Sequence, residues 1–556
     1  MEFIKTKGIE FDNIYNLTDI QYEIISKRIN NNTNIEDLLN KKLNLTKDLH
    51  KLKDLDKGGK LLKEHIDKNS KILIVSDYDS DGINSAIVLE YFFKAVLKYS
   101  NIDVFINRRK HGNGFNKYLT EDIIEYNPDL IITSDHGSSD NDSFKLIKDK
   151  ITTDIILTDH HIIPKDNYPN SVDIFINNQR EDSEYSKEVS GCFIAFLLTI
   201  ETYIEIYGKL DIHKFYEIIP NVAISTISDV MSLLEPINRK IVNLGINIVN
   251  SGKFEKWKIF NKIFDIHNFI TNKNIGWNIA PVINTGNRVD EEQKVFDIMS
   301  ELNTDVFIDK LPKLLELNKL RKKETRRIMS KMKDKPLEYS NCVIIDSKYN
   351  INGIIANNLA NKHNKPTICF SVNDDIMHGS GRSAKNINLH KVISDINNET
   401  DMVIKYGGHY GAVGLTISKD NYDKFIKLFD KYVKLNNVEE DKSYPYDIDL
   451  PNNMISYTLL EEINHIGPYG KNFEEPLFRS KFKITKVLTY DNFAKLYLKN
   501  SDGNLIMGMY YYNGEIGSDI NNKLVNNIII DTLYTLDTNA YISNTAISLN
   551  IKRIRI

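Results

Sequence analysis

Five short apolar runs between residues 71 and 178 constrain the fold more than any other feature of the sequence. They read KILIVSD (71–77), IDVFINR (102–108), DLIITSD (129–135), DIILTDHH (154–161) and VDIFINN (172–178). Between the first two runs, GINSAIVLEYFFKAVLKY has the apolar spacing of a helix. Strands that alternate with helices build right-handed βαβ units, because parallel neighbours need a crossover connection. The pattern therefore predicts an α/β domain with a mostly parallel sheet.

Acidic and histidine residues follow three of these strands at their carboxyl ends. The first strand runs into Asp77, Asp79 and Asp81, the third into Asp135, and the fourth into Asp159, His160 and His161. In an open parallel sheet, such strand ends meet along one edge, where ligands bind. Crowded carboxylates raise one another's pKa, so we expect a cation among them. Oxygen ligands with a few imidazoles suit Mn²⁺ or Mg²⁺, and the carboxylates suffice for two ions.

Each of these motifs also has a purely structural interpretation. Asp79-Ser80-Asp81-Gly82 is typical of a turn or a helix N-cap. A histidine near a strand end is more often structural than a metal ligand. The occurrence of such residues at three strand ends of one predicted sheet favours the metal site.

The rest of the chain divides into further segments by pattern. Apolar spacing predicts helices before residue 68 and again from about 185 to 310, and a strongly basic helix covers 317–335. A second α/β pattern begins at NCVIIDS, and the last residues are rich in strands and turns, as in a small β-barrel. We therefore predict a helical segment (1–68), an α/β domain (69–310), a basic connector helix (311–340), a second α/β domain (341–437), a linker and junction (438–477) and an OB-like β-barrel (478–556).

Composition indicates a soluble protein of several domains. The chain has 556 residues, of which 41% are hydrophobic and 27% charged. No apolar run is long enough to cross a bilayer, and MEFIKTKGIEFDN lacks the pattern of a signal peptide. The three cysteines do not form a metal-type pair, so we expect a cytoplasmic location and no disulfide framework. The net charge of −4 argues against wholesale nucleic-acid binding but does not exclude it, because the position of the basic residues decides it.

The order of motifs resembles the DHH phosphoesterase superfamily, and within it the RecJ-type single-stranded-DNA-specific 5′–3′ exonucleases. DYDSDG and DHH match the motifs that define the superfamily. The further matching segments are PNVAISTISDVMSLLEPINR (220–239), IAPVINTGNRVDE (279–291, similar to a Pro-x-x-Asn-x-x-Gly-Arg pattern), HGSGRSAKNINLH (378–390), YGGHYGAVGLTI (406–417) and INHIGPYGKNFEEPLF (463–478). The resemblance extends from about residue 50 to the C-terminus.

The resemblance implies roles for individual residues. It implies two Mn²⁺ or Mg²⁺ ions held by Asp79, Asp81, Asp135, His160 and Asp229, with Asp77 as a further ligand or as a support for one. His161 would contact the scissile phosphate or assist proton transfer. We expect Asp159 to be a catalytic residue together with His161. The residues implied to bind the end of the strand are Asn284, Arg288, Ser380, Arg382, Ser383, Gly407, Gly408 and His409.

Two positions depart from the family pattern. The second motif reads SDHG, where cysteine often follows the aspartate, so His136 is either an extra ligand or a plain substitute. After Gly-Gly-His the chain has Ala412-Val413-Gly414 instead of two alanines before the glycine. Val413 therefore adds bulk beside a glycine-rich segment that we expect to be a loop.

The implied function is 5′ to 3′ hydrolysis of single-stranded DNA in repair or recombination. The expected partner is single-stranded DNA, with a single-strand-binding protein as a second candidate; we expect a monomer and no membrane contact. The basic helix 317–335 either tracks the DNA backbone or is a solvated face, and the tyrosines of MGMYYYNG (507–514) either stack on bases or are ordinary strand residues. The alternatives are a phosphodiesterase of short oligonucleotides or cyclic dinucleotides, and an inactive replication scaffold.

Overall fold

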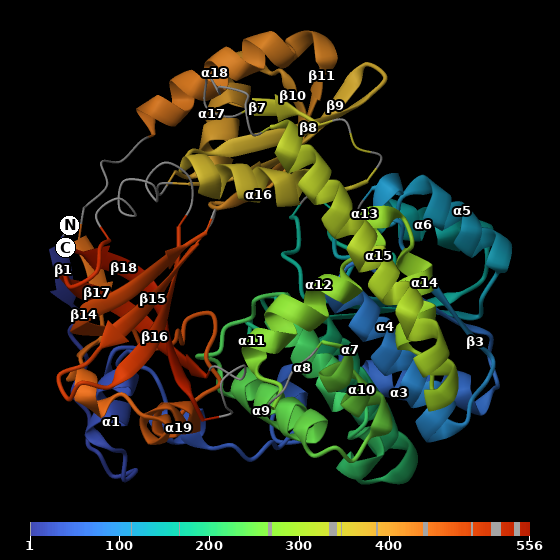
Figure 1. Ribbon diagram of the computed structural model, residues 1–556. Coiled ribbons are helices and arrows are strands. Elements are labelled where there is room, and N and C mark those ends of the chain that lie inside the picture. Colours follow the sequence, from blue (N-terminus) through green and yellow to red (C-terminus); the bar gives the residue numbers. More distant parts are fainter. Residues whose placement is uncertain are drawn as a thin grey trace. The chain divides into compact units, whose positions relative to one another are not determined.

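The computed structural model separates into two compact units (Figure 1). The larger unit contains residues 9–318 and 463–475, and the second unit contains residues 1–8, 319–462 and 476–556. The structure describes residues 2–556 except 113, 166, 265–268, 333–341, 346, 348, 385–386, 437–442, 491–492, 513–523 and 539–544.

A five-stranded, fully parallel sheet forms the centre of the larger unit, as predicted. Its strands lie in the order β3-β2-β4-β5-β6. Their bounds are β2 Ile72–Ser76, β3 Ile102–Ile106, β4 Leu130–Ser134, β5 Asp154–Asp159 and β6 Ile174–Asn177. All residues of β2 and β4 are buried, because helices cover both faces of the sheet.

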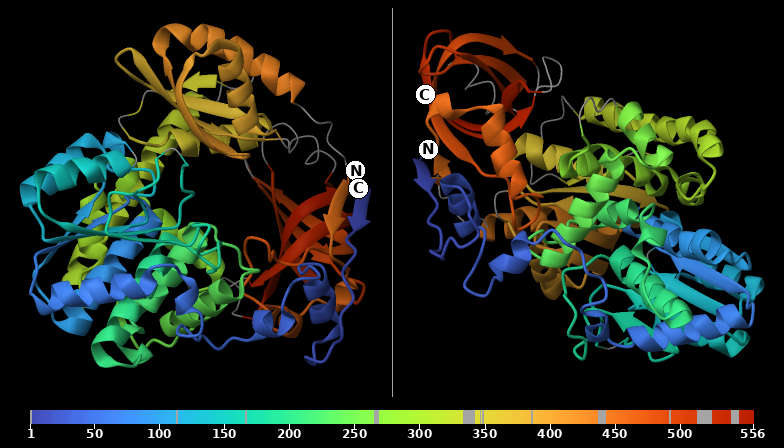
Figure 2. Two further views of the ribbon diagram at one scale, coloured as in Figure 1. Left: turned by 180° about the vertical axis from the view of Figure 1, so that it is seen from behind. Right: turned by 90° about the horizontal axis from the view of Figure 1, so that it is seen from below.

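Helices lie on both faces of this sheet (Figure 2). On one face, α5 and α6 pack Leu119, Ile123 and Phe144 against strand residues such as Val75 and Ile131. On the other face, α3, α4 and α7 contact the strands. The helices of this part are α1 Asp19–Ser26, α2 Ile35–Leu39, α3 Leu55–Asp67, α4 Ser80–Tyr91 with the π-helix η2 Phe92–Leu97, α5 Lys117–Tyr126, α6 Asn141–Lys150 and α7 Gly191–Tyr207.

Residues after α7 are helical, as predicted. The elements are α8 Ile219–Ser228, α9 Pro236–Asn250, α10 Glu255–Ile263, α11 Asn272–Asn274, the π-helix η5 Ile275–Ile279, α12 Ala280–Ile283, α13 Gly286–Val289, α14 Glu292–Met299 and α15 Thr304–Lys331. The basic segment lies in α15, which begins well before the predicted start at 311 and contains Pro312. Residues 333–335 of that segment lie outside the described part of the chain.

One buried arginine connects three segments of the larger unit. Arg239 of α9 is 3% exposed, and its guanidinium lies 4.1 Å from the Phe473 ring centroid. It donates hydrogen bonds to the main-chain oxygens of Leu38, Leu233, Ile466, Gly467 and Pro468. Burial lowers the pKa of Arg239 to about 10. Main-chain oxygens therefore take the place of a carboxylate partner for this cation.

The second unit contains a five-stranded sheet with helices on both faces (Figure 1). The strand order is β10-β11-β9-β8-β7, and only the β7–β8 pair is parallel. One face packs on α17 and α18 through a core that includes Phe370, Leu415 and Phe425, and the other face packs on α16. The elements are β7 Cys342–Ile344, α16 Asn352–His363, β8 Thr367–Asn373, β9 Ile376–Arg382, α17 Leu389–Thr400, β10 Val403–His409, β11 Ala412–Ser418 and α18 Tyr422–Leu435.

The C-terminal strands close into the predicted barrel. Each strand of the barrel pairs with the next in the spatial order β14-β15-β16-β18-β17. Strand β17 also pairs with β14, so the sheet closes and these five strands leave no open edge. Their bounds are β14 Phe478–Thr489, β15 Phe493–Lys499, β16 Leu505–Tyr511, β17 Ile529–Thr538 and β18 Ile547–Arg555, preceded by β12 Ser443–Tyr446, β13 Ile448–Asp449 and α19 Tyr457–His465. Among the described residues, no helix has both the length and the apolar character needed to span a bilayer.

The N-terminal segment differs from its predicted helical structure at its start. Residues Glu2–Lys5 form strand β1, which pairs in parallel with β12. Phe3 is 7% exposed and lies beneath the guanidinium groups of Arg479 and Arg555. These contacts come from residues more than 400 positions away, so local periodicity could not predict the strand.

We expect Arg239→Met to destabilise the larger unit by about 3 kcal/mol or more, because several buried main-chain oxygens would lose their donor. Scanning calorimetry should show a lower unfolding temperature for that unit. Arg108→Met removes an exposed arginine of the same unit and is the matched control. Equal unfolding temperatures for the two variants would contradict the structural role of Arg239.

Candidate metal centre

The first aspartate motif both caps a helix and contributes to an acidic cluster. Asp79 is the N-cap of α4, and its Oδ1 accepts hydrogen bonds from the main-chain N–H groups of Asp81 (2.8 Å) and Gly82 (3.2 Å). A Cβ on Gly82 would lie 2.3 Å from the main-chain oxygen of Asp77, so only glycine allows this turn. The structural interpretation of the motif is therefore correct, and it does not exclude metal binding.

Asp81 is held at the N-terminus of α7. Its Oδ2 accepts a hydrogen bond from Gly191 N (2.8 Å), and its Oδ1 accepts one from Cys192 N (2.8 Å) and one from the Ser225 hydroxyl. The positive end of the helix dipole adds to these hydrogen bonds. The carboxylate is 2% exposed, yet it is fully supplied with donors and stays fixed in place.

Asp135 follows β4 in a left-handed conformation, with φ at 62°. A Cβ on Gly191 would lie 2.4 Å from its Oδ1 and 2.7 Å from its Cβ, so the carboxylate fits only because residue 191 is glycine. Oδ1 of Asp135 is a buried oxygen that has no hydrogen-bond partner among the described residues. Such an oxygen fits a metal ligand, because a buried acceptor left unpaired is costly.

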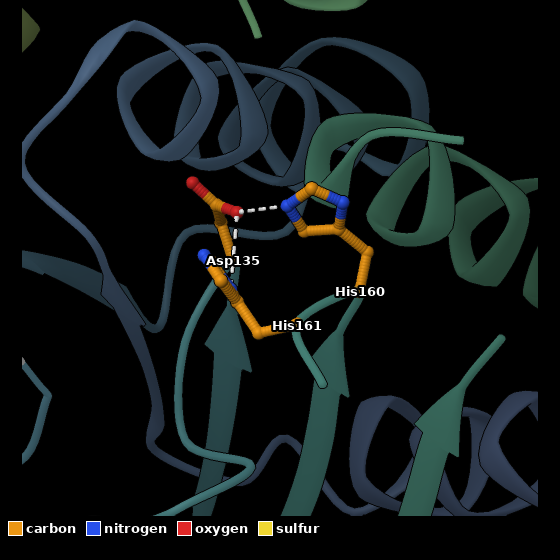
Figure 3. A group of neighbouring side chains, drawn as sticks. All are labelled: Asp135, His160 and His161. Atoms are coloured by element: carbon orange, nitrogen blue, oxygen red, sulfur yellow. Dashed lines mark ion pairs between the residues drawn. The ribbon is translucent and has the colours of Figure 1, made fainter. Parts of the chain in front are cut away.

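His160 joins the acidic residues into one centre. Its Nε2 lies 3.3 Å from Asp135 Oδ1, 3.6 Å from Asp81 Oδ2 and 3.6 Å from Asp229 Oδ2. Its Nδ1 lies 3.0 Å from the main-chain oxygen of Val189, which orients the ring. Figure 3 shows that the imidazoles of His160 and His161 both approach the same oxygen of the Asp135 carboxylate.

Asp159 orients His161. The Oδ1 of this buried aspartate lies 2.8 Å from His161 Nδ1, and its Oδ2 accepts a hydrogen bond from Ser138 N. Asp159 raises the pKa of His161 to about 10, and His161 in turn helps to lower the pKa of Asp159 against the effect of burial. The side chain of His161 is 59% exposed, so its second nitrogen is open to a ligand.

Ligand atoms of the centre gather in three overlapping groups. Within each group, the candidate ligand atoms lie no more than 4.8 Å apart. The groups are Asp77–Asp79–Asp135, Asp81–His160–Asp229 and Asp135–His160–His161. Asp229 reaches the centre from the end of α8. The structure thus brings together all the predicted ligands, from β2, β4, β5 and α8.

Electrostatics favour a cation at this centre. Burial, followed by repulsion from neighbouring aspartates, raises the pKa of Asp77, Asp79 and Asp135, and raises that of Asp229 to about 7. Asp81 and Asp229 raise the pKa of His160, although burial opposes it. A divalent ion would relieve the repulsion, and carboxylates with imidazole are the ligands that Mn²⁺ and Mg²⁺ take. The residues present therefore fit such ions.

His136 stands apart from these groups. Its ring stacks on Phe115 at 4.9 Å, and its Nε2 lies 3.2 Å from the main-chain oxygen of Val75. Burial lowers the pKa of His136 to about 4, so the ring is neutral at physiological pH. The structure therefore supports the interpretation that His136 merely replaces the cysteine of the family pattern and is not an extra metal ligand.

The 279–291 segment supports the first aspartate motif. Asn284 Oδ1 accepts a hydrogen bond from Ser80 N (2.9 Å), and Asn287 Nδ2 lies 3.5 Å from the main-chain oxygen of Tyr78. Counted from Pro281, Asn287 occupies the glycine position of the Pro-x-x-Asn-x-x-Gly-Arg pattern, so the segment departs from that pattern at one further position. Burial raises the pKa of Tyr78, and the charge of Arg288 partly offsets this shift.

The other predicted substrate residues lie in the second unit. Arg382 donates from Nη1 to the main-chain oxygen of Gly381 (2.8 Å), and its Nη1 lies 3.4 Å from Ser380 Oγ. The hydroxyl of Ser383 donates to the main-chain oxygen of Ile387 (2.5 Å), a structural contact. Residues Gly407, Gly408 and His409 end strand β10 and do not form the expected loop.

Val413 is accommodated by a glycine on a neighbouring strand. It pairs with Gly381 on β9 and with Gly408 on β10. A Cβ on Gly381 would lie 2.7 Å from Val413 Cγ2, so the valine side chain takes the space that this glycine leaves free. A Cβ on Gly408 would instead meet the main chain, 2.3 Å from the oxygen of Ala412.

The structure does not decide whether the basic helix and the barrel tyrosines contact DNA or are ordinary surface and strand residues. Arg327 of α15 forms two hydrogen bonds of 2.7 Å with Glu324, as on an ordinary solvated helix face, whereas Lys322, Lys323 and Arg326 are exposed. In the barrel, Tyr511 is 61% exposed and its ring lies 5.7 Å from that of Phe493. Tyr510 and Tyr512 are buried, and residues 513–514 lie outside the described part.

Sequence reasoning missed three residues near the centre. Gly191 and Ser225 fix Asp135 and Asp81, and the Arg109 guanidinium lies 5.7 Å from the Tyr78 ring centroid. The position of Arg109 could have been predicted, because it follows β3 at the same edge of the sheet. No sequence feature distinguishes Gly191 or Ser225, since a glycine at the start of a helix and a serine within one are common.

Family models match three parts of the chain. They are the DHH family N-terminal domain at residues 71–220, the DHHA1 domain at 343–435 and the RecJ OB domain at 446–553. The chain is similar to the single-stranded-DNA-specific exonuclease RecJ of Haemophilus influenzae, with 25% identity over 538 residues and 91% of each chain covered. It is 26% identical to the protein of the same name from Bacillus subtilis over 441 residues, which cover 76% of this chain and 53% of the relative.

Solved structures have the same fold. The crystal structure of RecJ from Thermus thermophilus in complex with Mn²⁺ matches with a TM-score of 0.78 and 19% identity, over 99% of this chain and 79% of that one. A structure of exonuclease RecJ bound to manganese matches with a TM-score of 0.58 and 21% identity, over 72% and 99%. The likeness therefore covers the whole architecture described above.

Gly191→Ala should weaken Mn²⁺ binding by about tenfold or more, because the added methyl group would displace the Asp135 carboxylate. Isothermal titration calorimetry measures this affinity. The control is Gly276→Ala, whose Cβ would meet only Ile227 Cγ2 at an ordinary 3.7 Å. If the two variants bound Mn²⁺ equally well, Asp135 would not be a ligand.

Proposed function

Because this chain belongs to the DHH family and has the domain order of RecJ exonucleases, we propose that it hydrolyses single-stranded DNA from the 5′ end. The observation that carries the proposal is the acidic centre. Five aspartates and two histidines, from the segments that follow β2, β4 and β5 and from the end of α8, form three overlapping groups of candidate ligands in a chain that also has a second α/β domain and a barrel. A phosphodiesterase of short oligonucleotides would have no evident need for the barrel.

In this mechanism, Asp79, Asp81, Asp135, His160 and Asp229 hold two Mn²⁺ or Mg²⁺ ions, and Asp77 supports the set from the end of β2. Bound ions of this kind lower the pKa of an attacking water and stabilise charge on the phosphate. The helix N-terminus and Ser225 keep Asp81 in place, so the site is organised before the substrate arrives.

His161 is the residue proposed to act on the phosphate directly. Its Nδ1 faces Asp159, so its Nε2 is the atom that can donate a hydrogen bond to a phosphate oxygen. Asp159 favours the protonated ring, and the exposed side chain can reach a ligand. The pair therefore serves to orient the substrate and to hold a proton at Nε2.

In the second unit, Arg382 and Ser380 with the Gly407-Gly408-His409 segment are proposed to bind the 5′ phosphate. A Cβ on Gly407 would meet nothing within 4 Å, so the sheet is open above this position. Arginine suits a phosphate because its guanidinium can form two parallel hydrogen bonds. Asn284 and Arg288 are proposed to contact the strand beside the first aspartate motif. A single-strand-binding protein as partner, a monomeric state and a cytoplasmic location stay predictions.

Asp135→Asn should lower kcat on a 5′-labelled single strand in Mn²⁺ by more than about 100-fold, because the centre loses a charged ligand. The expected wild-type result is cleavage of the free strand, none of a blunt duplex, and none after chelation. Asp142→Asn, an exposed aspartate of α6, is the matched control. Cleavage by the wild type without a divalent ion, or full activity of Asp135→Asn, would refute the proposal.

Arg382→Ala should raise KM about tenfold for a 5′-phosphorylated strand and much less for a 5′-hydroxyl strand, because a charge-assisted hydrogen bond is lost. Steady-state kinetics on the two strands measures the difference. Lys391→Ala, an exposed residue of α17, is the control. Equal losses on both strands would argue against a terminal-phosphate site.

A further inference from the structure

Val230, directly after Asp229, has a backbone conformation that valine rarely takes. Its φ is 56°, in the left-handed region. The N–H groups of Val230 and Met231 donate to the oxygens of Ile227 (3.2 Å) and Thr226 (3.0 Å) at the end of α8. This is the helix-ending motif in which glycine is strongly preferred at the position of Val230. A β-branched residue there is a true outlier and costs stability.

Burial does not compensate for this cost. The side chain of Val230 is 59% exposed, so most of its surface has no protein contact. The carboxylate of the preceding residue, Asp229, lies 3.6 Å from His160 Nε2 in the metal centre. Strained residues of this kind cluster at functional sites, where the strain serves binding.

A second exposed apolar residue follows another residue of the same centre. Ile162 is 85% exposed and comes directly after His161, whose ring lies 4.6 Å from that of His160. Ile162 and Val230 thus each follow a residue of one metal centre, and both side chains are aliphatic and exposed. We call this pair the apolar rim.

We propose that the apolar rim packs against the nucleobase beside the scissile phosphate, so that cleavage depends on a base being present. The inference rests on the proposed function, and it adds a contact that neither phosphate nor metal binding requires. The phosphate and its sugar are polar, and the base face is the apolar part of a nucleotide next to the bond that is cut. Every base has such a face, so the contact is independent of base sequence.

The test compares a normal single strand with one that carries an abasic residue at the 5′-terminal nucleotide. The wild type should cleave the normal strand with a kcat/KM about tenfold higher, the value expected for burial of one aliphatic side chain. Val230→Gly and Val230→Asn both accept a positive φ but remove the aliphatic group. For both variants the ratio of kcat/KM values should fall towards one, while their unfolding temperatures should not fall.

Lys98→Gly is the matched control, because Lys98 has a φ of 58° and is exposed elsewhere in the same unit. It should keep the wild-type ratio. A wild type that cleaves both strands equally, or Val230 variants that keep the full ratio, would overturn the inference and leave the proposed function intact. A wild type that cleaves no strand would overturn the proposed function and this inference with it.

Discussion

The hydrogen bonds between Asp81 and the first turn of α7 hold the metal centre in position. Two main-chain N–H groups and the Ser225 hydroxyl bind this buried carboxylate, and α7 itself packs on α3, α4 and α8. Because α7 begins with Gly191, its backbone also approaches Asp135 closely. One helix terminus thus fixes two aspartates from different segments of the chain, and His160 Nε2 lies within 3.6 Å of both carboxylates.

Much of this centre could be predicted, because the relevant information is local. Parallel strands deliver the residues that follow them to one edge, so Asp77, Asp135 and His160 had to lie near one another once the strands were recognised. The two interpretations of Asp79 were not exclusive: the same carboxylate caps α4 with Oδ1 and belongs to the acidic group. The resemblance added Asp229, which follows a helix and which the strand pattern alone does not place.

The features that escaped prediction depend on contacts between distant residues. Strand β1 exists because Phe3 packs beneath Arg479 and Arg555. The side chain of Val413 fits because residue 381, its partner on a neighbouring strand, is glycine. Arg239 looks ordinary in the sequence, yet it binds main-chain oxygens from three separate segments. Local sequence patterns do not encode such pairings, since each half of a contact is common on its own.

The metal centre carries energetic costs of two kinds. Asp135 and Val230 both have a positive φ there, and the buried aspartates repel one another. Stable packing elsewhere has to maintain this arrangement, and the fully buried strands β2 and β4 with their helices supply it. A cation that binds only the folded chain removes the repulsion and so stabilises it, which couples metal binding to the stability of the fold. The backbone strain at Val230 is not electrostatic, so a bound cation does not relieve it.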